Sequence, residues 1–239
     1  MRSPGPAVRM CPRLLAIAEL VVPGRVLADI GTDHALLPAA LVLRGTVPRA
    51  LACDRAADPL VRARATIDRH GLADRIALRR GEGLAALIDA DEVATVVIAG
   101  MGAGTLLGIL AADLARTRGC QRLVLQPNHG HGQVRRWLVD HDFSVVDERL
   151  TEDRERFYTV IAAEPGRAAA AGWSRAAWAV GPVVLRRGGP VLERWAAAEL
   201  RRCDRADRRT PGLAMVVERR ALVAEALAQA RALAHPGPA

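Results

Sequence analysis

The chain has 239 residues, of which 51% are hydrophobic, 25% are charged and 3% are aromatic. This composition excludes a disordered chain, because a domain of about 150 residues can bury roughly 70% of its unfolded surface and so offset the entropy lost on folding. The length fits one compact domain with a smaller appendage.

The positive charge is concentrated in the last third of the chain. Residues 1–164 contain 21 Arg and 20 acidic residues, whereas residues 165–239 contain 13 Arg and six acidic residues, a net charge of +7. Clustered arginines attract phosphates, so we expect the tail to bind a polyanion or an acidic partner. The alternative is compositional bias, because the chain has no Lys and is rich in Ala and Arg.

The four cysteines are far apart and form neither a CxxC pair nor a cluster with histidines: Cys11, Cys53, Cys120 and Cys203. This spacing predicts free thiols, no metal site and a reducing, cytoplasmic location. Residues 1–9 are expected to form a disordered extension. The apolar run at 14–22 contains Glu19 and is not followed by a cleavage site, so it predicts a helix and not a signal peptide.

A second apolar segment, residues 93–112, carries no charge over a length that could cross a membrane. Its first half is rich in β-branched residues, and its middle is GMGAG, which would place three glycines at the centre of the bilayer. A buried strand, a glycine turn and a helix explain this pattern better. We therefore expect no membrane contact.

Apolar strand-like segments alternate with helical segments through the first two thirds of the chain. Strands are predicted at 26–31, 49–54, 76–81, 93–100 and 122–127, and helices at 35–43, 58–70 and 133–141. Near-continuous apolar strands separated by helices are typical of a parallel sheet that is covered on both faces.

The last two predicted strands, 143–149 and 157–164, are separated only by a polar segment that includes TEDRER. This connection is too short for a crossover helix, so the two strands must pair antiparallel. Five parallel strands followed by such a hairpin form the Rossmann-like, seven-stranded α/β sheet of class I S-adenosylmethionine-dependent methyltransferases. A plain dinucleotide-binding fold lacks the reversed last strand.

The composition changes after residue 165. Helices are predicted at 190–209, with Pro at the first turn, and at 213–234, joined by a tight turn. Apolar residues recur at sevens, threes and fours in the second helix, which predicts a coiled-coil hairpin. We therefore expect a catalytic domain at 10–165 and a small, basic helical domain at 166–239.

Acidic residues follow three successive predicted strands. Asp29 and Gly31 end the first strand, Asp54 ends the second, and Glu82 and Gly83 follow the third. An open parallel sheet binds ligands at the carboxyl ends of its strands, so these residues suit a ligand with an ammonium group, a ribose and an adenine. S-adenosylmethionine has all three groups. It has no pyrophosphate, which agrees with the absence of a full GxGxxG motif.

Several segments together resemble the bacterial tRNA (adenine(22)-N(1))-methyltransferase family. They are ADIGTDHALLP (28–38), GEGL (81–84), IAGMGAGTL (98–106), LQPN (125–128), VRRWL (134–138) and FYTVIAAE (157–164). The resemblance implies a class I methyltransferase domain with a coiled-coil appendage. It also implies that S-adenosylmethionine is the methyl donor and that N1 of an adenine in the D-arm region of tRNA is the acceptor.

This reaction requires alignment more than it requires a nucleophile, because N1 of adenine has a free lone pair near neutral pH. Methylation makes the exocyclic amine more acidic, and we expect Asp33 to stabilise it, with His34 as orienter or proton acceptor. The alternative for His34 is to hold Asp33 or the backbone. Asn128 is expected to bond the adenine edge or the methionyl group, and the alternative is that it caps the next helix.

The predicted cofactor contacts are at the ends of the first four strands: Asp29, Gly31, Thr32, Asp54, Glu82, Gly83, Gly100 and Met101. A flipped adenine usually stacks on an aromatic side chain. Tyr158 is the candidate for that role, because its hydroxyl gives it a polar end, whereas core packing is expected for Trp137 and Phe157.

Other functions remain open at this point. The chain could be a class I methyltransferase for another RNA or a small amine, a nicotinamide-dependent oxidoreductase, or an RNA-binding module without turnover. Eight arginines lie near the first tail helix, but none is assigned to RNA: Arg186, Arg187, Arg194, Arg201, Arg202, Arg205, Arg208 and Arg209. The oligomeric state is also left open.

Overall fold

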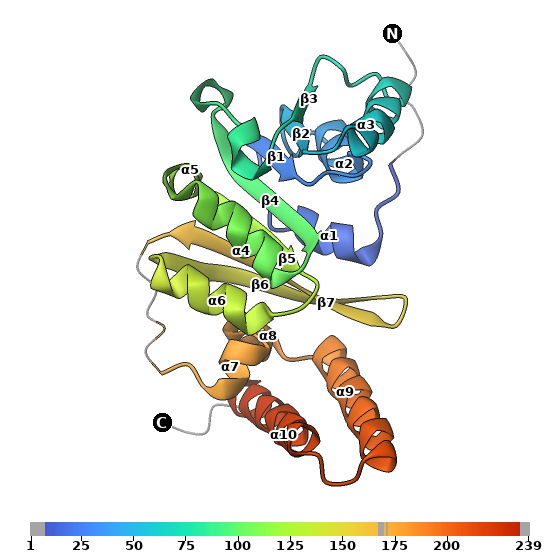
Figure 1. Cartoon of the computed structure of the whole chain (residues 1–239), viewed down its shortest axis with the longest axis vertical. Coiled ribbons are helices and arrows are strands. Elements are labelled where there is room, and N and C mark those ends of the chain that lie inside the picture. Colours follow the sequence, from blue (N-terminus) through green and yellow to red (C-terminus); the bar gives the residue numbers. More distant parts are fainter. Residues whose placement is uncertain (1–7, 167–169, 171, 235–239) are drawn as a thin grey trace.

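Figure 1 shows the computed structural model of the chain, which describes residues 8–166, 170 and 172–234. Residues 1–7 of the extension expected at 1–9 therefore lie outside the described residues. Within the described part of the chain, no helix is long and apolar enough to cross a membrane. The uncharged segment 93–112 forms a strand, a turn and a helix, as predicted.

Seven strands form one sheet in the order β3-β2-β1-β4-β5-β7-β6. The strands are β1 (Val26–Ile30), β2 (Ala50–Asp54), β3 (Ile76–Arg80), β4 (Val93–Met101), β5 (Arg122–Pro127), β6 (Phe143–Asp153) and β7 (Arg156–Pro165). Strands β1 to β5 are parallel, and β7 is antiparallel to both β5 and β6. This topology confirms the predicted class I methyltransferase sheet.

The β6–β7 hairpin is longer than predicted. The polar segment that we expected to separate the strands continues the pairing, with Thr151 opposite Tyr158 and Asp153 opposite Arg156. Only Arg154 and Glu155 form the turn, and both have positive φ angles. Such a two-residue turn follows the right-handed twist of its strands, so polar residues can extend the ribbon into solvent.

Helices cover both faces of the sheet (Figure 1). They are α1 (Pro12–Ala18), α2 (Leu36–Leu43), α3 (Ala57–Arg69), α4 (Ala103–Ala112), α5 (Leu114–Gly119) and α6 (His131–Asp140), with short 3-10 turns at Gly83–Ala86 and Asp89–Asp91. Strand β4 shows why two layers form, because Val97 packs with α1–α3 while Val96 and Ile98 pack with α4 and α6. Alternate residues of a strand face opposite sides of the sheet.

The C-terminal part contains four helices: α7 (Arg175–Ala179), α8 (Pro182–Arg187), α9 (Pro190–Arg209) and α10 (Ala214–Ala234). The predicted two-helix hairpin is therefore incomplete, since α10 packs on α7 and α8 as well as on α9. Their common core also includes Leu150 and Phe157 from the β6–β7 hairpin. We call α7–α10 the helical unit; a domain boundary near residue 166 stays a prediction.

A buried ion pair joins the helical unit to the sheet. Arg135 on α6 and Glu148 on β6 both have 0% exposed side chains, and Arg135 Nε lies 2.7 Å from Glu148 Oε1. Arg135 also donates hydrogen bonds to the carbonyls of Trp178, Ala179 and Val180 at the end of α7. Glu148 Oε2 accepts from the backbone N–H of Val183 in α8, so both charges are satisfied.

Candidate active site

Two adjoining cavities lie at the carboxyl ends of the parallel strands. The larger, of about 520 Å³, is lined at β2 and β3 by Asp54, Glu82 and Gly83, and we call it the β2–β3 cavity. The smaller, of about 320 Å³, is lined by Asp29 and its neighbours, and we call it the β1 cavity. Gly31 lines both. A single elongated ligand could therefore occupy both along the edge of the sheet.

Gly31 has a backbone conformation that favours glycine. Its φ angle is +78°, and a Cβ atom there would collide with the Cε methyl of Met101. Met101 ends β4 and lines the β2–β3 cavity, so its side chain packs directly over Gly31. Strands β1 and β4 thus come together where the two cavities join.

Asp29 carries the most perturbed carboxyl group of these two cavities. Burial raises its pKa to about 6 from 3.8, while the nearby Thr32 hydroxyl and Arg13 guanidinium oppose the increase. An ionised carboxylate in such surroundings favours a cationic partner. Asp29 is therefore suited to receive an ammonium group in the β1 cavity.

Asp33 and His34 also line the β1 cavity, but their partners are protein groups. Asp33 Oδ1 accepts a hydrogen bond from Arg62 Nε of α3 at 2.9 Å, and its Oδ2 lies 3.3 Å from His34 Nε2. The predicted Asp33 and His34 pair is thus formed, with an additional cation that sequence analysis did not include. Neither residue lines the cavity that contains Asn128.

Asp54 and Glu82 lie in the β2–β3 cavity as predicted. Asp54 Oδ1 accepts from the backbone N–H of Ala56 at 2.8 Å, which fixes the carboxylate at the end of β2. Glu82 is exposed and lies 3.7 Å from Arg55. Because the two carboxylates line one cavity, a ribose and its base could each find an acceptor there.

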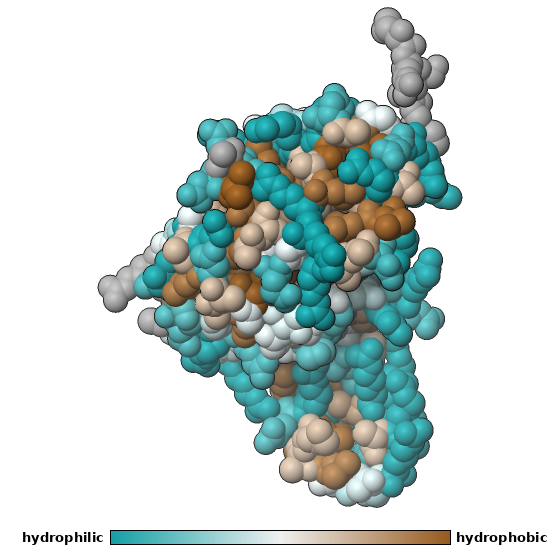
Figure 2. All heavy atoms as spheres, turned by 45° about the horizontal axis from the view of Figure 1, so that its top comes forward, coloured by the Kyte–Doolittle hydropathy of each residue, from teal (hydrophilic) through white to brown (hydrophobic). Residues whose placement is uncertain are grey.

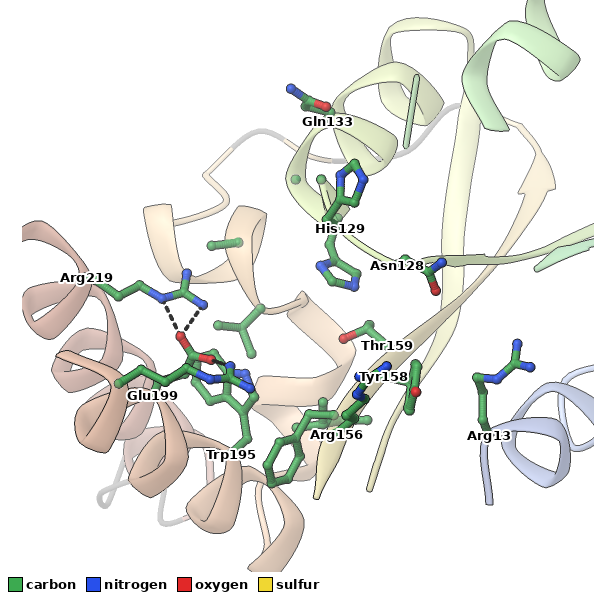
Figure 3. A pocket seen from close by; sticks show the side chains of 18 of the residues that line it. Arg13, Asn128, His129, Gln133, Arg156, Tyr158, Thr159, Trp195, Glu199 and Arg219 are labelled. Carbon is green, nitrogen blue, oxygen red and sulfur yellow. Dashed lines mark hydrogen bonds and ion pairs between the residues drawn. The ribbon is translucent and has the colours of Figure 1, made fainter. Parts of the chain in front are cut away.

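A third cavity, of about 970 Å³, opens between the sheet and the helical unit (Figure 3). We call it the large cavity. Arg13 and Gly100 line both it and the β1 cavity, so the two adjoin at these residues. In Figure 3, Arg13 lies on the sheet side and the ion pair of Glu199 and Arg219 on the helical side, with Tyr158 between them.

Gln126 organises the boundary between the β1 cavity and the large cavity. Its side chain is fully buried, and Oε1 accepts from Arg13 Nη1 at 2.9 Å and from the N–H of Gly100 at 3.1 Å. Its Nε2 donates to Pro127 O at 3.0 Å and to Asn128 Oδ1 at 3.3 Å. One amide thus holds three groups that line the large cavity.

Asn128 does not cap the helix that follows it. The N-cap of α6 is Gly130, and Asn128 instead donates from Nδ2 to the carbonyl of Gly100 at 2.7 Å. Its N–H also bonds Met101 O at 2.7 Å. These bonds tie the end of β5 to the turn after β4. The side chain lies in the large cavity, where its oxygen can face a substrate.

The aromatic residues divide largely as predicted. Tyr158 lines the large cavity, where the guanidinium of Arg13 lies 5.8 Å from its ring centroid. Trp137 packs in the core and stacks on His141 with 4.0 Å between ring centroids. Phe157 packs against the helical core but also lines the large cavity, so it has both roles.

Two histidines at the start of α6 line the large cavity, His129 in the preceding loop and His131 as the first residue of the helix. Burial and the charge of Arg135 lower the pKa of His131 to about 4, so its imidazole is neutral near pH 7. The ring of His129 packs so closely on Gly102 that a Cβ atom there would lie 2.8 Å from Nε2. His131 is therefore suited to an uncharged role, and His129 packs against the turn after β4.

Comparison with known proteins identifies the fold family and the enzyme family. The model of the methyltransferase domain family matches residues 10–161. The tRNA (adenine(22)-N(1))-methyltransferase of Bacillus subtilis (strain 168) is 35% identical over 192 residues, which are 79% of this chain and 80% of that relative. The chain belongs to the tRNA (adenine(22)-N(1))-methyltransferase family.

Solved structures agree with this assignment. Sp1610 of Streptococcus pneumoniae, described as a candidate tRNA (m1A22) methyltransferase, has a TM-score of 0.84 and 31% identity over 92% of this chain and 100% of that one. The structure of the same protein in complex with S-adenosyl-L-methionine gives a TM-score of 0.80 and 32% identity, over 90% of this chain and 98% of that one.

Two residues of this family member were missed by sequence analysis, Arg13 and Gln126. Arg13 is the one charged side chain of α1, in an otherwise apolar segment, which was the only available signal. Gln126 was part of the LQPN segment, but its burial and four hydrogen bonds follow from the packing of β5 beside β4. Neither contact could be derived from spacing.

The cysteines near the sheet are unsuited to nucleophilic chemistry, and the expectation of no metal site stays a prediction. The described residues contain no group of three or more His, Cys, Asp or Glu residues that could hold a metal ion. Cys53, beside the β1 end, and Cys120 are buried, and burial raises the pKa of both thiols to about 12. Such thiols are poor nucleophiles near neutral pH.

Proposed function

We propose that this protein transfers a methyl group from S-adenosylmethionine to N1 of adenine 22 in tRNA. The observation that carries this proposal is the meeting of cavities at Gly100 and Arg13. Acidic side chains line the two smaller cavities. The large cavity, which has room for a base, adjoins the β1 cavity at Arg13 and Gly100. Because the proposed substrate is tRNA, we also propose that the protein acts in the cytoplasm.

The donor's functional groups match the residues of the two smaller cavities. Its ammonium group suits Asp29, and its carboxylate suits Arg13, which lies beside Asp29 in the β1 cavity. The ribose hydroxyls suit Asp54, and Glu82 and Gly83 line the space for the adenine. When bound, the donor supplies an electrophilic methyl group on sulfur. Thr32, Gly31 and Met101 complete the proposed set of cofactor contacts.

The large cavity would orient the acceptor base. The Asn128 oxygen can accept from the exocyclic amine of adenine, and its Nδ2 bond to Gly100 fixes the direction in which that oxygen points. Tyr158 offers a ring for stacking. Asp33 and His34 remain the proposed groups for the proton of the methylated base, and the hydrogen bond from Arg62 would hold the Asp33 carboxylate in place.

Methylation of unmodified tRNA tests the proposal. The protein is incubated with methyl-labelled donor and bulk tRNA from cells that lack the modification, and the nucleosides are then separated. N1-methyladenosine is expected, and it should disappear when adenine 22 is replaced in a single transcript. Another methylated nucleoside, or none, would reject the proposal. Asp33→Ala should abolish turnover and leave donor affinity within about threefold, a difference of less than ~1 kcal/mol.

A further inference from the structure

The arginines of α9 lie on one face of that helix. At about 100° per residue, six of them fall within a sector of roughly 120°. They are Arg194, Arg201, Arg202, Arg205, Arg208 and Arg209. The stripe is about 22 Å long at about 1.5 Å per residue. We call this face the arginine stripe.

The other faces of α9 have different compositions. Leu192, Trp195 and Cys203 are buried against the helical core or its neighbours. Glu193, Asp204 and Asp207 lie beside the arginine stripe, along the edge opposite the one that adjoins Trp195. The positive charge of α9 is therefore concentrated along a single line on its exposed side.

A groove of about 510 Å³ runs between the arginine stripe and the turn of the β6–β7 hairpin. It is lined by Arg194, Arg201, Arg202 and Arg205 from α9 and by Glu152, Glu155 and Phe157 from the hairpin. Phe157 and Arg202 line both this groove and the large cavity. The groove is thus a continuation of the large cavity away from the sheet.

Ion pairs separate the structural arginines from those available to a ligand. Arg194 pairs with Glu152 at 2.7 Å, Arg202 and Arg219 pair with Glu199, and Arg187 lies 2.8 Å from Asp147. Among the described residues, four arginines that line these two spaces make no ion pair: Arg13, Arg156, Arg201 and Arg205. Arg13 is held by its hydrogen bond to Gln126, so the other three are the ones available to a ligand. Their charge is uncompensated beside the path to the sheet.

We propose that the groove and the adjoining wall of the large cavity bind the phosphodiester backbone of the RNA strand that carries the target base. Arg201 and Arg205 in the groove and Arg156 in the large cavity would contact phosphates. This inference rests on the proposed function. The planar guanidinium forks of arginine match phosphate oxygens, and continuity with the large cavity would lead the strand toward the methyl donor. Figure 2 shows hydrophilic residues along the sides of the protruding helical end and an apolar patch at its tip.

An RNA strand fits these features better than an acidic protein segment does. The large cavity joins the groove through Phe157, and its wall also contains Tyr158 and Trp195, so bases can stack while phosphates follow the arginines. An acidic peptide would use the arginines but would bring no base to the site at Gly100.

The double variant Arg201→Gln/Arg205→Gln tests the inference against the control Arg186→Gln/Arg231→Gln. The control removes the same charge from exposed arginines of α8 and α10 that line neither space. Binding of full-length tRNA is measured at several salt concentrations. The slope of log K against log salt should fall by about 1.5 in the test variant, because each lost phosphate contact removes roughly 0.7 to 0.9. It should be unchanged in the control.

The outcomes separate this inference from the proposed function. Donor affinity and the melting temperature should equal those of the wild type in both variants, and KM for tRNA should rise at least tenfold only in the test variant. An unchanged salt slope and KM in the test variant would reject RNA binding by the groove. An equal loss of tRNA affinity in the control would also reject it. If the wild type methylates no tRNA adenine but the test variant alone loses tRNA affinity, the groove stands and the proposed function fails.

Discussion

Asp29 links the burial of one carboxyl group to the ligand that it would hold. Its raised pKa means that the empty protein loses stability as pH rises from about 4 to about 6, because the carboxylate must then ionise in poorly hydrated surroundings. A cationic ligand would offset that cost. The residue is therefore costly to the fold in the free protein and useful in the complex.

The Asp29→Asn variant should separate these two effects. The free variant is expected to be more stable than the wild type at pH 7, by at most about 3 kcal/mol for a shift of roughly two units. Wild-type donor affinity should fall as pH drops from 7 to 5, and that of the variant should be weaker and independent of pH. Calorimetry and thermal unfolding at both pH values measure this; a pH-independent wild type contradicts it.

Gln126 is the second residue whose replacement is informative. Gln126→Leu keeps the volume similar but leaves Arg13 Nη1 and the Gly100 N–H without their acceptor. The free energy of unfolding should fall by about 1–3 kcal/mol, the cost of buried groups left unpaired. Methyl transfer should fall by at least tenfold because Arg13, Gly100 and Asn128 are no longer held together. Unchanged kcat in a folded variant would show that this amide is only structural.

Among single residues, the sequence predicted the site residues at strand ends better than the residues that position them. Asp29, Gly31, Asp54 and Glu82 were found because the carboxyl ends of parallel strands share one edge. The Arg62 contact to Asp33 was not, because it joins α3 to the loop after β1 and depends on helix packing. The same reason explains the absence of Arg13 from the predicted site.

Elements with strong periodicity were predicted within a few residues, and short ones were missed. The five parallel strands and α9 match their expected ranges closely, since buried apolar runs and an N-terminal Pro mark them. Helices α5, α7 and α8 have five or six residues each and no repeating pattern. Helix α8 forms because Gly181 allows Arg135 and Glu148 to approach the backbone that precedes it.

The joint between α6, β6 and the helical unit depends on the buried pair of Arg135 and Glu148. Arg135→Met should lower the free energy of unfolding by about 3–5 kcal/mol, because Glu148 would remain buried without its partner. The double variant Arg135→Met/Glu148→Leu should cost less than the sum of the two single changes. Chemical denaturation measures this cycle.

Arg136 provides the matched control for that experiment. It is the next residue of α6, but it is exposed and lies over the ring of Trp178, with 4.0 Å to the ring centroid. Arg136→Met should cost less than about 1 kcal/mol, since exposed cation–π contacts are weak. Equal costs at the two positions would contradict the structural role of the buried pair.

For the molecule as a whole, the helical unit is bound to the catalytic part and is no freely attached tail. Its core includes Leu150 and Phe157, and its backbone accepts the hydrogen bonds of Arg135. The sequence predicted a basic helical part by composition, but it did not predict this shared core. The long-range packing of α7 on α6 and of α8 on β6 has no local signal.

Removing residues 166–239 should therefore damage more than tRNA binding. The truncated chain would expose Leu150 and Phe157 and leave Arg135 without its carbonyl partners. We expect loss of cooperative thermal unfolding, or aggregation on size-exclusion chromatography, and weaker donor binding. A truncated chain that melts cooperatively near the wild-type temperature would show that the catalytic part folds alone.

The proposed donor site has one decisive geometric feature: the donor lies along the edge of the sheet and presents its methyl group at Gly100 toward the large cavity. A crystal structure with the demethylated product of the donor tests this directly. We expect the amino group beside Asp29, the ribose beside Asp54 and the sulfur facing the cavity of Asn128. Product bound elsewhere, or with its sulfur facing away from Asn128, would contradict it.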